Sequence, residues 1–143
     1  ALDNLARQPL IDDGLNFAHG TGHGVGCFLC VHEEASSISP RGKDRLRPGM
    51  LLSNEPGYYQ EGGYGVRHEN LMLCQEDSDG SYYFETVTCV PFDVRGIDWD
   101  LMSADDVAWL RGYHHHVVTT LSPFLDEDEL RWLRTAAFCA EIG

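Results

Sequence analysis

The stretch HGTGHGVG, residues 19–26, places a glycine at every second position from Gly20 to Gly26 and two histidines four residues apart, His19 and His23. Because glycine has no Cβ, this pattern lets the backbone approach a ligand or a neighbouring segment closely. A third histidine, His32, follows nine residues after His23 in the sequence VHE. We therefore expect the segment to carry chemistry, since imidazole both binds metals and transfers protons near neutral pH.

Two glutamates further along the chain could complete a metal site with His23. Glu55 lies in SNEPGYY, residues 53–59, and Glu69 lies in GVRHEN, residues 65–70. A set that mixes imidazole with carboxylates favours Mn, Co or Zn over Ca. Each residue taken alone has an ordinary alternative, a solvated strand position or a structural ion pair. From residue types and spacing alone, the sequence indicates only a candidate metal-dependent hydrolase.

The pattern of apolar residues and turn signals predicts strands followed by helices, an α+β arrangement. Residues 1–14 are predicted to form a helix with Pro9 near its first turn, and residues 34–47 a polar loop. Helices are expected after Ser103, which has Asp106 three residues on, and after Asp126, which has Glu129. The predicted strands are Phe28–His32, Met50–Asn54, Val66–Gln75 and Tyr82–Val90, the last two as a hairpin.

The bulk composition excludes several classes of function. The chain has 143 residues, 43% of them hydrophobic, and a net charge of -13. That charge argues against partners rich in phosphate, whether nucleic acid or an anionic membrane surface. There is no apolar run long enough for a transmembrane helix and no signal peptide at the N-terminus. Length and composition predict one soluble domain.

The cysteines and the run of three histidines have ordinary structural explanations. The five cysteines, an odd number without a secretory signal, indicate reduced thiols in a cytoplasmic protein. Cys27 and Cys30 form a C-x-x-C pair, but on an extended strand they would point to opposite faces, so we expect ordinary buried or half-buried thiols. Residues 114–116 are three histidines within a predicted helix, where consecutive side chains do not converge on one ion.

The blocks HGTGHGVG, VHE, SNEPGYY and GVRHEN, in this order, resemble the aminopeptidase P family of pita-bread metallopeptidases. The resemblance runs through almost the whole chain, including the lead-in LDNLAR to DDGLNF and the late stretch from Phe84 to Asp98. It implies that residues 1–143 are the C-terminal part of the catalytic domain. The fold it implies is a curved, mostly antiparallel sheet with helices on its convex face.

The resemblance also implies a role for each site residue. His23, Glu55 and Glu69 match metal ligands, with Glu69 bridging two ions and Glu55 also handling the proton of the attacking water. His19 and His32 match histidines that contact the substrate and move protons. Arg67 is expected on the same strand face as Glu69, as a supporting partner. The implied cofactor is a pair of divalent ions, manganese first, with cobalt or zinc as alternatives.

The implied activity is release of the N-terminal residue from a peptide with proline in second position. Relatives also use two aspartates well upstream of the GHG step, and neither these nor the upstream domains occur in residues 1–143. We therefore expect this chain alone to be an incomplete and inactive fragment that holds metal weakly. A cut through the domain would expose a sheet edge and apolar surface, so we expect a homodimer.

Three rival functions remain open at this stage. A prolidase-type dipeptidase shares the fold and much of the site. A non-catalytic pita-bread module would suit the acidic charge by binding a basic partner, although it would not need the histidines and glutamates. Metal-free chemistry of the creatinase kind uses the same scaffold, and the NEPG and RHEN blocks disfavour it.

Overall fold

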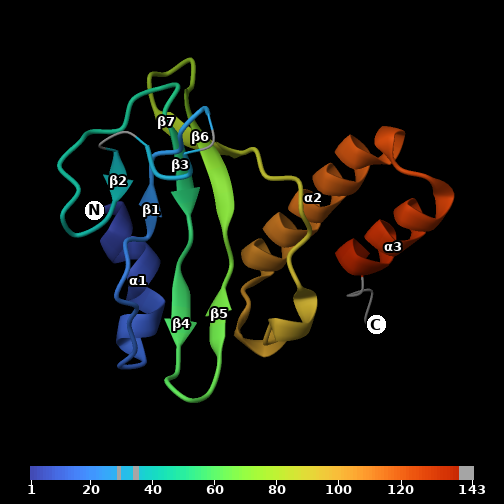
Figure 1. Ribbon diagram of the computed structural model, residues 1–143, viewed down its shortest axis with the longest axis horizontal. Coiled ribbons are helices and arrows are strands. Elements are labelled where there is room, and N and C mark those ends of the chain that lie inside the picture. The colour runs from blue at the N-terminus through green and yellow to red at the C-terminus, as the bar shows by residue number, and fades with distance from the viewer. Residues whose placement is uncertain (29, 34–35, 139–143) are drawn as a thin grey trace. The chain divides into compact units, whose positions relative to one another are not determined.

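The computed structural model describes residues 1–28, 30–33 and 36–138, and its contacts divide the chain into two compact units, Ala1–Thr88 and Cys89–Gly143 (Figure 1). Unit 1 holds one helix and all seven strands of the described residues, and unit 2 holds two α-helices and three short 3-10 turns. The helices and strands are α1 (Leu2–Asp12), β1 (Gly22–His23), β2 (Ser37–Ile38), β3 (Leu51–Asn54), β4 (Gly57–Tyr59), β5 (Gly65–Arg67), β6 (Asn70–Glu76), β7 (Tyr82–Thr86), α2 (Ala104–Leu121) and α3 (Glu127–Phe138).

The strands of unit 1 pair only in antiparallel fashion, as the sequence predicts, but they form three small sheets. The central sheet has the order β3-β6-β7, and β1-β2 and β4-β5 are two-stranded. The hairpin β6-β7 turns at residues 77–81, where Gly80 has a φ of +82° that suits glycine. The α+β class is thus confirmed.

Several predictions of local structure in unit 1 are wrong. Pro9 lies inside α1, not in its first turn. Because proline has no N–H, the Leu5 carbonyl receives no helical hydrogen bond, but Leu5 is exposed and water can donate to that carbonyl instead. The described residues of Phe28–His32 form bends, not a strand, because the Gly26 N–H donates to the Cys30 carbonyl (2.8 Å) and folds the chain back. The predicted loop 34–47 contains β2.

The predicted strand Val66–Gln75 is interrupted and becomes β5 and β6. Pairing stops at His68 and Glu69, which lie across from Glu55 and Pro56 on the other arm of the hairpin. A proline has no N–H to donate to a ladder, so pairing fails next to it. This interruption shapes the site described below.

Unit 2 begins its long helix as predicted. Ser103 accepts a hydrogen bond from the Asp106 N–H (3.1 Å), and Asp106 accepts one from the Ser103 N–H (3.1 Å), which is a capping box at the start of α2. Asp126 and Glu129 exchange the same pair of bonds before α3. No helix among the described residues is long and apolar enough to cross a membrane.

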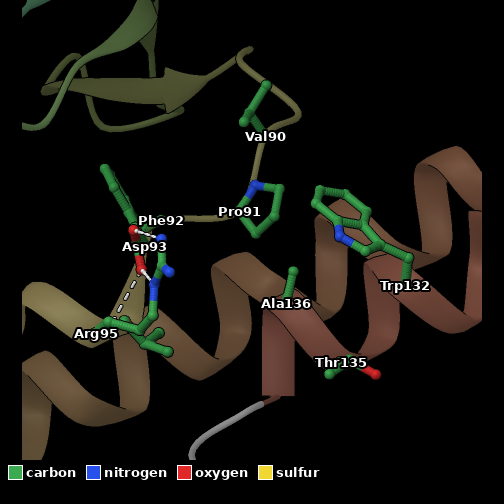
Figure 2. Close-up of a pocket in the computed structure, with 9 residues that line it drawn as sticks. Val90, Pro91, Phe92, Asp93, Arg95, Trp132, Thr135 and Ala136 are labelled. Carbon is green, nitrogen blue, oxygen red and sulfur yellow. Dashed lines mark hydrogen bonds and ion pairs between the residues drawn. The ribbon is translucent and has the colours of Figure 1, made fainter.

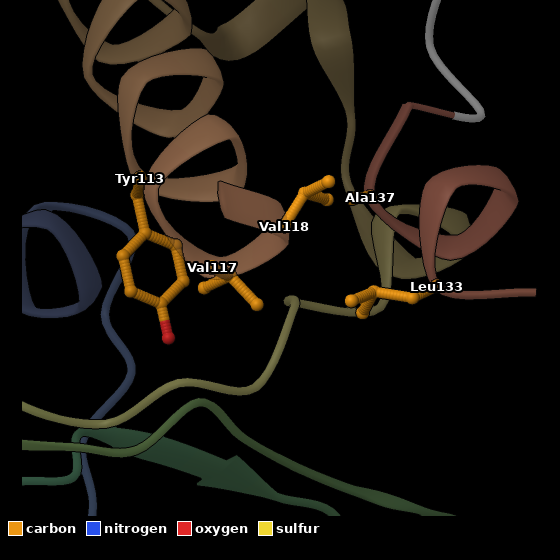
Figure 3. Packing of buried hydrophobic residues seen from close by; sticks show 5 residues of the cluster. All are labelled: Tyr113, Val117, Val118, Leu133 and Ala137. Atoms are coloured by element: carbon orange, nitrogen blue, oxygen red, sulfur yellow. The ribbon is translucent and has the colours of Figure 1, made fainter. Parts of the chain in front are cut away.

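The core of unit 2 lies between α2 and α3 (Figure 3). Its buried residues are Tyr113, Val117, Val118, Leu133 and Ala137. His114 is also buried, and its Nε2 accepts the Phe92 N–H (3.0 Å) while its Nδ1 donates to the Ala137 carbonyl (2.6 Å). Both ring nitrogens are therefore used in the neutral form of the imidazole. As the sequence predicts, the first of the three histidines serves packing, and His115 and His116 are exposed.

Candidate metal centre

Two carboxylates meet at the interruption of the hairpin formed by β3, β4, β5 and β6. The pairs Asn54 with Asn70 and Gly57 with Arg67 belong to one continuous register. This register sets Glu55 directly opposite Glu69, where cross-strand side chains lie within about 4.5–5.5 Å at Cβ. Like charges in such a pair repel. The arrangement therefore favours a cation between them.

The histidine of the cluster comes from β1, which runs antiparallel beside β3. The Glu55 N–H donates to the Thr21 carbonyl (2.7 Å), and Gly24 forms a bridge with Leu52. A Cβ on Gly22 would lie 2.0 Å from the Ser53 carbonyl oxygen, so only glycine lets β1 approach this closely. The alternating glycines thus bring one segment against another, and His23 reaches the glutamates as a result.

His23 and Glu55 present their ligand atoms to each other. Their Nε2 and Oε1 atoms are 3.1 Å apart, and ligand atoms of His23, Glu55 and Glu69 all lie within 4.8 Å of one another. The Nδ1 of His23 donates to the Gly24 carbonyl (2.8 Å). A neutral imidazole with that tautomer has a lone pair on Nε2. Two lone pairs at this separation repel unless a proton or a cation lies between them.

The surroundings of Glu55 hold its carboxylate in one orientation. The residue is only 9% exposed. The buried Ser53 hydroxyl accepts the His23 N–H (2.9 Å) and donates to Glu55 Oε1 (3.1 Å). The Arg67 guanidinium stands 3.8 Å from Glu55 Oε2. An imidazole nitrogen and carboxylate oxygens fixed in this way form a donor set that suits Mn, Co or Zn.

A chain of hydrogen bonds runs from Arg67 through Tyr59 to His19. The Arg67 Nε–H donates to the Tyr59 hydroxyl oxygen (2.8 Å), and that hydroxyl is hydrogen-bonded to His19 Nε2 (2.8 Å). His19 Nδ1 donates to the Gly20 carbonyl (2.8 Å). A neutral His19 with its proton on Nδ1 gives every donor of this chain of bonds an acceptor. The bond with Tyr59 raises the pKa of Arg67 above its ordinary value.

His32 reaches the cluster from the loop after β1. Its ring centroid lies 4.1 Å from that of His23, at an angle of 44°. The Glu33 N–H donates to the Gly24 carbonyl (3.2 Å), which folds the loop back over the end of β1. His32 is exposed, so one face of its ring remains open to a bound molecule.

A buried arginine anchors the segment that leads into β1. The Arg7 side chain donates from α1 to Asp3 (2.8 Å), to Asn16 (2.9 Å) and to the carbonyls of Phe17 and His19 (2.6 Å each). Burial raises the pKa of Asp3, but hydrogen bonds from Arg7 and from the Thr21 hydroxyl (2.7 Å) more than offset it and hold that pKa below its ordinary value. Helix α1 thereby positions both His19 and the start of β1.

Comparison with known proteins assigns this arrangement to a family. Residues 1–76 match metallopeptidase family M24, and residues 80–138 match the C-terminal region of peptidase M24. The chain belongs to metallopeptidase family M24. Within the family it is 39% identical to aminopeptidase P1 of Arabidopsis thaliana and 45% identical to a probable Xaa-Pro aminopeptidase P of Metarhizium acridum. These matches cover 94% and 93% of this chain but only 22% and 24% of the relatives.

Solved structures of the M24 family give the same result. The X-prolyl aminopeptidase of Caenorhabditis elegans, described as a cytosolic enzyme with a di-nuclear active site, matches 95% of this chain with a TM-score of 0.86 and 36% identity. The chain covers 24% of that enzyme. The prolidase of Pyrococcus furiosus matches 58% of this chain with a TM-score of 0.50 and 35% identity. The resemblance to the aminopeptidase P family and to the pita-bread fold is thus confirmed.

The structure brings the residues expected of an M24 site into two neighbouring groups. His23, Glu55 and Glu69 form the first, with Arg67 beside Glu55 and His32 against His23. His19 lies in the second group, bonded to Tyr59. Arg67 lies in β5, opposite Gly57 of β4, and its guanidinium stands beside Glu55. The sequence predicted only the strand face on which it would lie.

Sequence reasoning missed several residues that support the candidate metal centre. Tyr59 is part of the quoted block SNEPGYY, so its place four residues after Glu55 was visible, but its hydrogen bonds were not. Ser53 and Arg7 gave no signal by spacing or type. Their burial and their partners appear only once β1, β3 and α1 are together.

Two hollows lie in unit 2. One of about 440 Å³ lies between residues 90–95 and α3, with Trp132 on its rim and the ion pair of Arg95 with Asp93 on its wall (Figure 2). A second, of about 560 Å³, adds Leu121 and Leu125 to an apolar lining. Neither includes a residue of the candidate metal centre.

Proposed function

We propose that this chain supplies His23, Glu55 and Glu69 to the dimetal centre of an Xaa-Pro aminopeptidase. The observation that carries the proposal is the register that sets the two glutamates opposite each other, with the His23 imidazole beside them. Glu69 would bridge two ions, because a carboxylate offers one oxygen to each. We propose manganese as the metal, with cobalt or zinc as alternatives that the same donors accept.

Two divalent ions in such a centre would make hydroxide available near neutral pH and polarise the peptide carbonyl. The chain's own residues have separate tasks. Glu55, held by Ser53 and Arg67, would take the proton of the attacking water. Its low exposure and fixed orientation suit that task, since a general base must stay within hydrogen-bond reach of the proton it removes.

His19 and His32 would act on the substrate. With its proton on Nδ1, His19 would exchange a proton with the Tyr59 hydroxyl through Nε2. Once protonated at Nε2 through Tyr59, His19 would donate to the oxyanion of a tetrahedral intermediate about 3 Å away. The proline nitrogen of an Xaa-Pro bond carries no hydrogen, so a proton must be delivered to it as it leaves. His32, exposed beside His23, is suited to that delivery.

The chain spans about a quarter of the relatives that it matches. We propose that residues 1–143 form the C-terminal part of a metallopeptidase catalytic domain and that two further aspartate ligands come from outside this stretch. Three groups with two facing carboxylates hold a pair of dications weakly. The chain alone is therefore proposed to be inactive and cytoplasmic. The proposed substrate of the complete site is a peptide with an Xaa-Pro N-terminus.

Prolidase activity is the second candidate, and one observation favours it. The prolidase of Pyrococcus furiosus shares the fold over 58% of this chain at 35% identity. The aminopeptidase of Caenorhabditis elegans matches 95% of the chain, which favours aminopeptidase activity. The two activities differ in substrate length, so a tripeptide and a dipeptide separate them.

We also propose that the protein forms a homodimer through unit 2. Trp132 is 68% exposed beside the apolar hollow of about 560 Å³ lined by Leu121 and Leu125. An aromatic anchor next to an apolar hollow is typical of the centre of an interface. Sedimentation should give a dimer for the wild type and a monomer for Trp132→Asp. A monomeric wild type would contradict this.

A chimera tests the function. The chain would replace the matching quarter of the Caenorhabditis elegans enzyme, and the product would be assayed with Mn²⁺ on an Xaa-Pro-Yaa tripeptide and an Xaa-Pro dipeptide. We expect hydrolysis of the tripeptide, abolished by Glu55→Gln, and no hydrolysis by the chain alone. Preference for the dipeptide would favour prolidase. A folded chimera that cleaves neither peptide would contradict a peptidase role.

A further inference from the structure

The loop that carries His32 also carries two exposed thiols, Cys27 and Cys30. Buried or half-buried thiols were expected here, and for this pair that prediction is wrong. The expectation assumed a strand, in which Cα atoms three residues apart are separated by about 10 Å. A disulfide needs a Cα separation of about 4.4–6.8 Å. On a strand, therefore, the pair could not be joined.

The chain instead folds back on itself between Gly26 and Cys30. The Gly26 N–H donates to the Cys30 carbonyl (2.8 Å), and a Cβ on Gly26 would lie 2.2 Å from that oxygen. This bond sets the backbone of Gly26 next to that of Cys30. Cys27 directly follows Gly26, so both thiols belong to residues at or next to this hydrogen bond. Rotation of exposed side chains can bring the two sulfurs together.

The Cys30 thiol is also connected to the candidate metal centre. Its S–H donates to the His32 carbonyl (3.0 Å), and the His32 ring lies against that of His23. A sulfur in a disulfide carries no hydrogen. Joining Cys30 to Cys27 would therefore remove this hydrogen bond to the His32 backbone.

We propose that Cys27 and Cys30 form a reversible disulfide under hydroperoxide and that this disulfide shifts His32. One thiolate attacks the peroxide O–O bond, giving a sulfenic acid and releasing water or an alcohol. The second thiol attacks that sulfur and expels water, forming the S–S bond. The two thiols lose two electrons and two protons, and the peroxide is reduced. A dithiol reductant reverses the reaction.

Tryptic mapping of the chain after hydrogen peroxide treatment tests the disulfide. Peptide 8–41 contains Cys27 and Cys30 and no other cysteine, whereas peptide 68–95 contains Cys74 and Cys89. We expect peptide 8–41 to lose two hydrogens and both alkylation sites, and to regain them with dithiothreitol. Cys27→Ser and Cys30→Ser should each prevent the loss. Burial of Cys74, which also raises the pKa of its thiol, should leave that cysteine alkylatable after unfolding, as an internal control.

Retention of both alkylation sites in peptide 8–41, oxidation only to sulfinic acid, or a disulfide from either residue to another cysteine would overturn the proposal. The coupling to His32 has its own measurement, the NMR signals of the His23 and His32 ring protons. We expect them to shift on oxidation of the wild type and not of Cys27→Ser. Unchanged signals in a protein that has formed the disulfide would refute the coupling.

Only the effect on turnover rests on the proposed function. In the chimera, peroxide should lower kcat on the tripeptide, and Cys27→Ser should keep the rate of the reduced enzyme. A reduced chimera without activity would count against the peptidase role alone, because the peptide map does not depend on it. A mapped disulfide with unchanged kcat would overturn the regulatory part of this inference.

Discussion

Replacement of Arg7 by alanine is expected to destabilise unit 1 severely. Arg7 is 7% exposed, and its guanidinium lies 3.9 Å from the centre of the Phe17 ring. The substitution leaves the buried Asp3 carboxylate without its cation and two carbonyls without their donor. Breaking a buried ion pair by removing one partner costs about 3–5 kcal/mol. That cost is a large part of the total stability of an ordinary domain.

Hydrogen exchange is the suitable assay, because the three tryptophans lie at residues 99, 109 and 132 and fluorescence therefore reports only on unit 2. A loss of about 3–5 kcal/mol corresponds to exchange about 10²- to 10³-fold faster or more, since about 1.4 kcal/mol is a factor of ten. We expect that acceleration in β3 and β6 of Arg7→Ala, with unit 2 unchanged.

Arg131→Ala is the matched control. Arg131 pairs with Asp128 at 2.9 Å, close to the 2.8 Å between Arg7 and Asp3, but both side chains of this pair are largely exposed. Exposed pairs contribute about 0–1 kcal/mol. Protection of α3 should therefore change by no more than about fivefold. Equal effects of the two substitutions in their own units would refute the view that burial of the Arg7 network holds the site segment.

Three further predictions concern single groups. Burial lowers the pKa of His114 below 6.5, and its hydrogen bond to the Ala137 carbonyl offsets only part of that shift. Below about pH 6.5 the unfolded chain therefore binds more protons than the folded one, and the free energy of unfolding of unit 2 should fall as the pH drops. Denaturant melts followed by tryptophan fluorescence should show this pH dependence in the wild type and in His115→Gln but not in His114→Gln. Gly22→Ala should lower the stability of unit 1 by about 1–3 kcal/mol, measured by hydrogen exchange in β3, because the added Cβ meets a carbonyl. Gly112→Ala has open space around its Cβ in α2 and should raise the stability of unit 2 by about 0.5–1 kcal/mol in denaturant melts. Tyr59→Phe in the chimera should lower kcat about five- to tenfold, because it removes a hydrogen bond to His19 that contributes about 1–1.5 kcal/mol. An unchanged kcat would show that Tyr59 takes no part in the mechanism.

The sequence was informative where local chemistry decides structure. Both helix starts of unit 2 follow from capping residues, and the hairpin β6-β7 follows from its alternation and its turn. The glutamates could be named from their blocks. The register of the flanking strands sets them opposite each other, and Pro56, which has no N–H, interrupts the ladder at that point.

The sequence was uninformative where distant segments meet. The buried charges of Arg7 and Asp3 look like surface residues of an exposed helix until the carbonyls of Phe17 and His19 cover them. The loop around Cys27 looked extended because Phe28 and Val31 favour strands, and the hydrogen bond from Gly26 overrides that preference. The ligand roles of His23, Glu55 and Glu69 remain predictions.

The metal content of the chimera, by elemental analysis after incubation with Mn²⁺ and gel filtration, tests the central claim most directly. We predict about two ions per chain for the wild type and a clear loss for Glu69→Gln, whose side chain is close to glutamate in size but lacks the charge to bridge two dications. Glu85→Gln, which changes a glutamate of β7 outside the cluster, should keep the metal. Equal metal content in Glu69→Gln and the wild type would contradict the account.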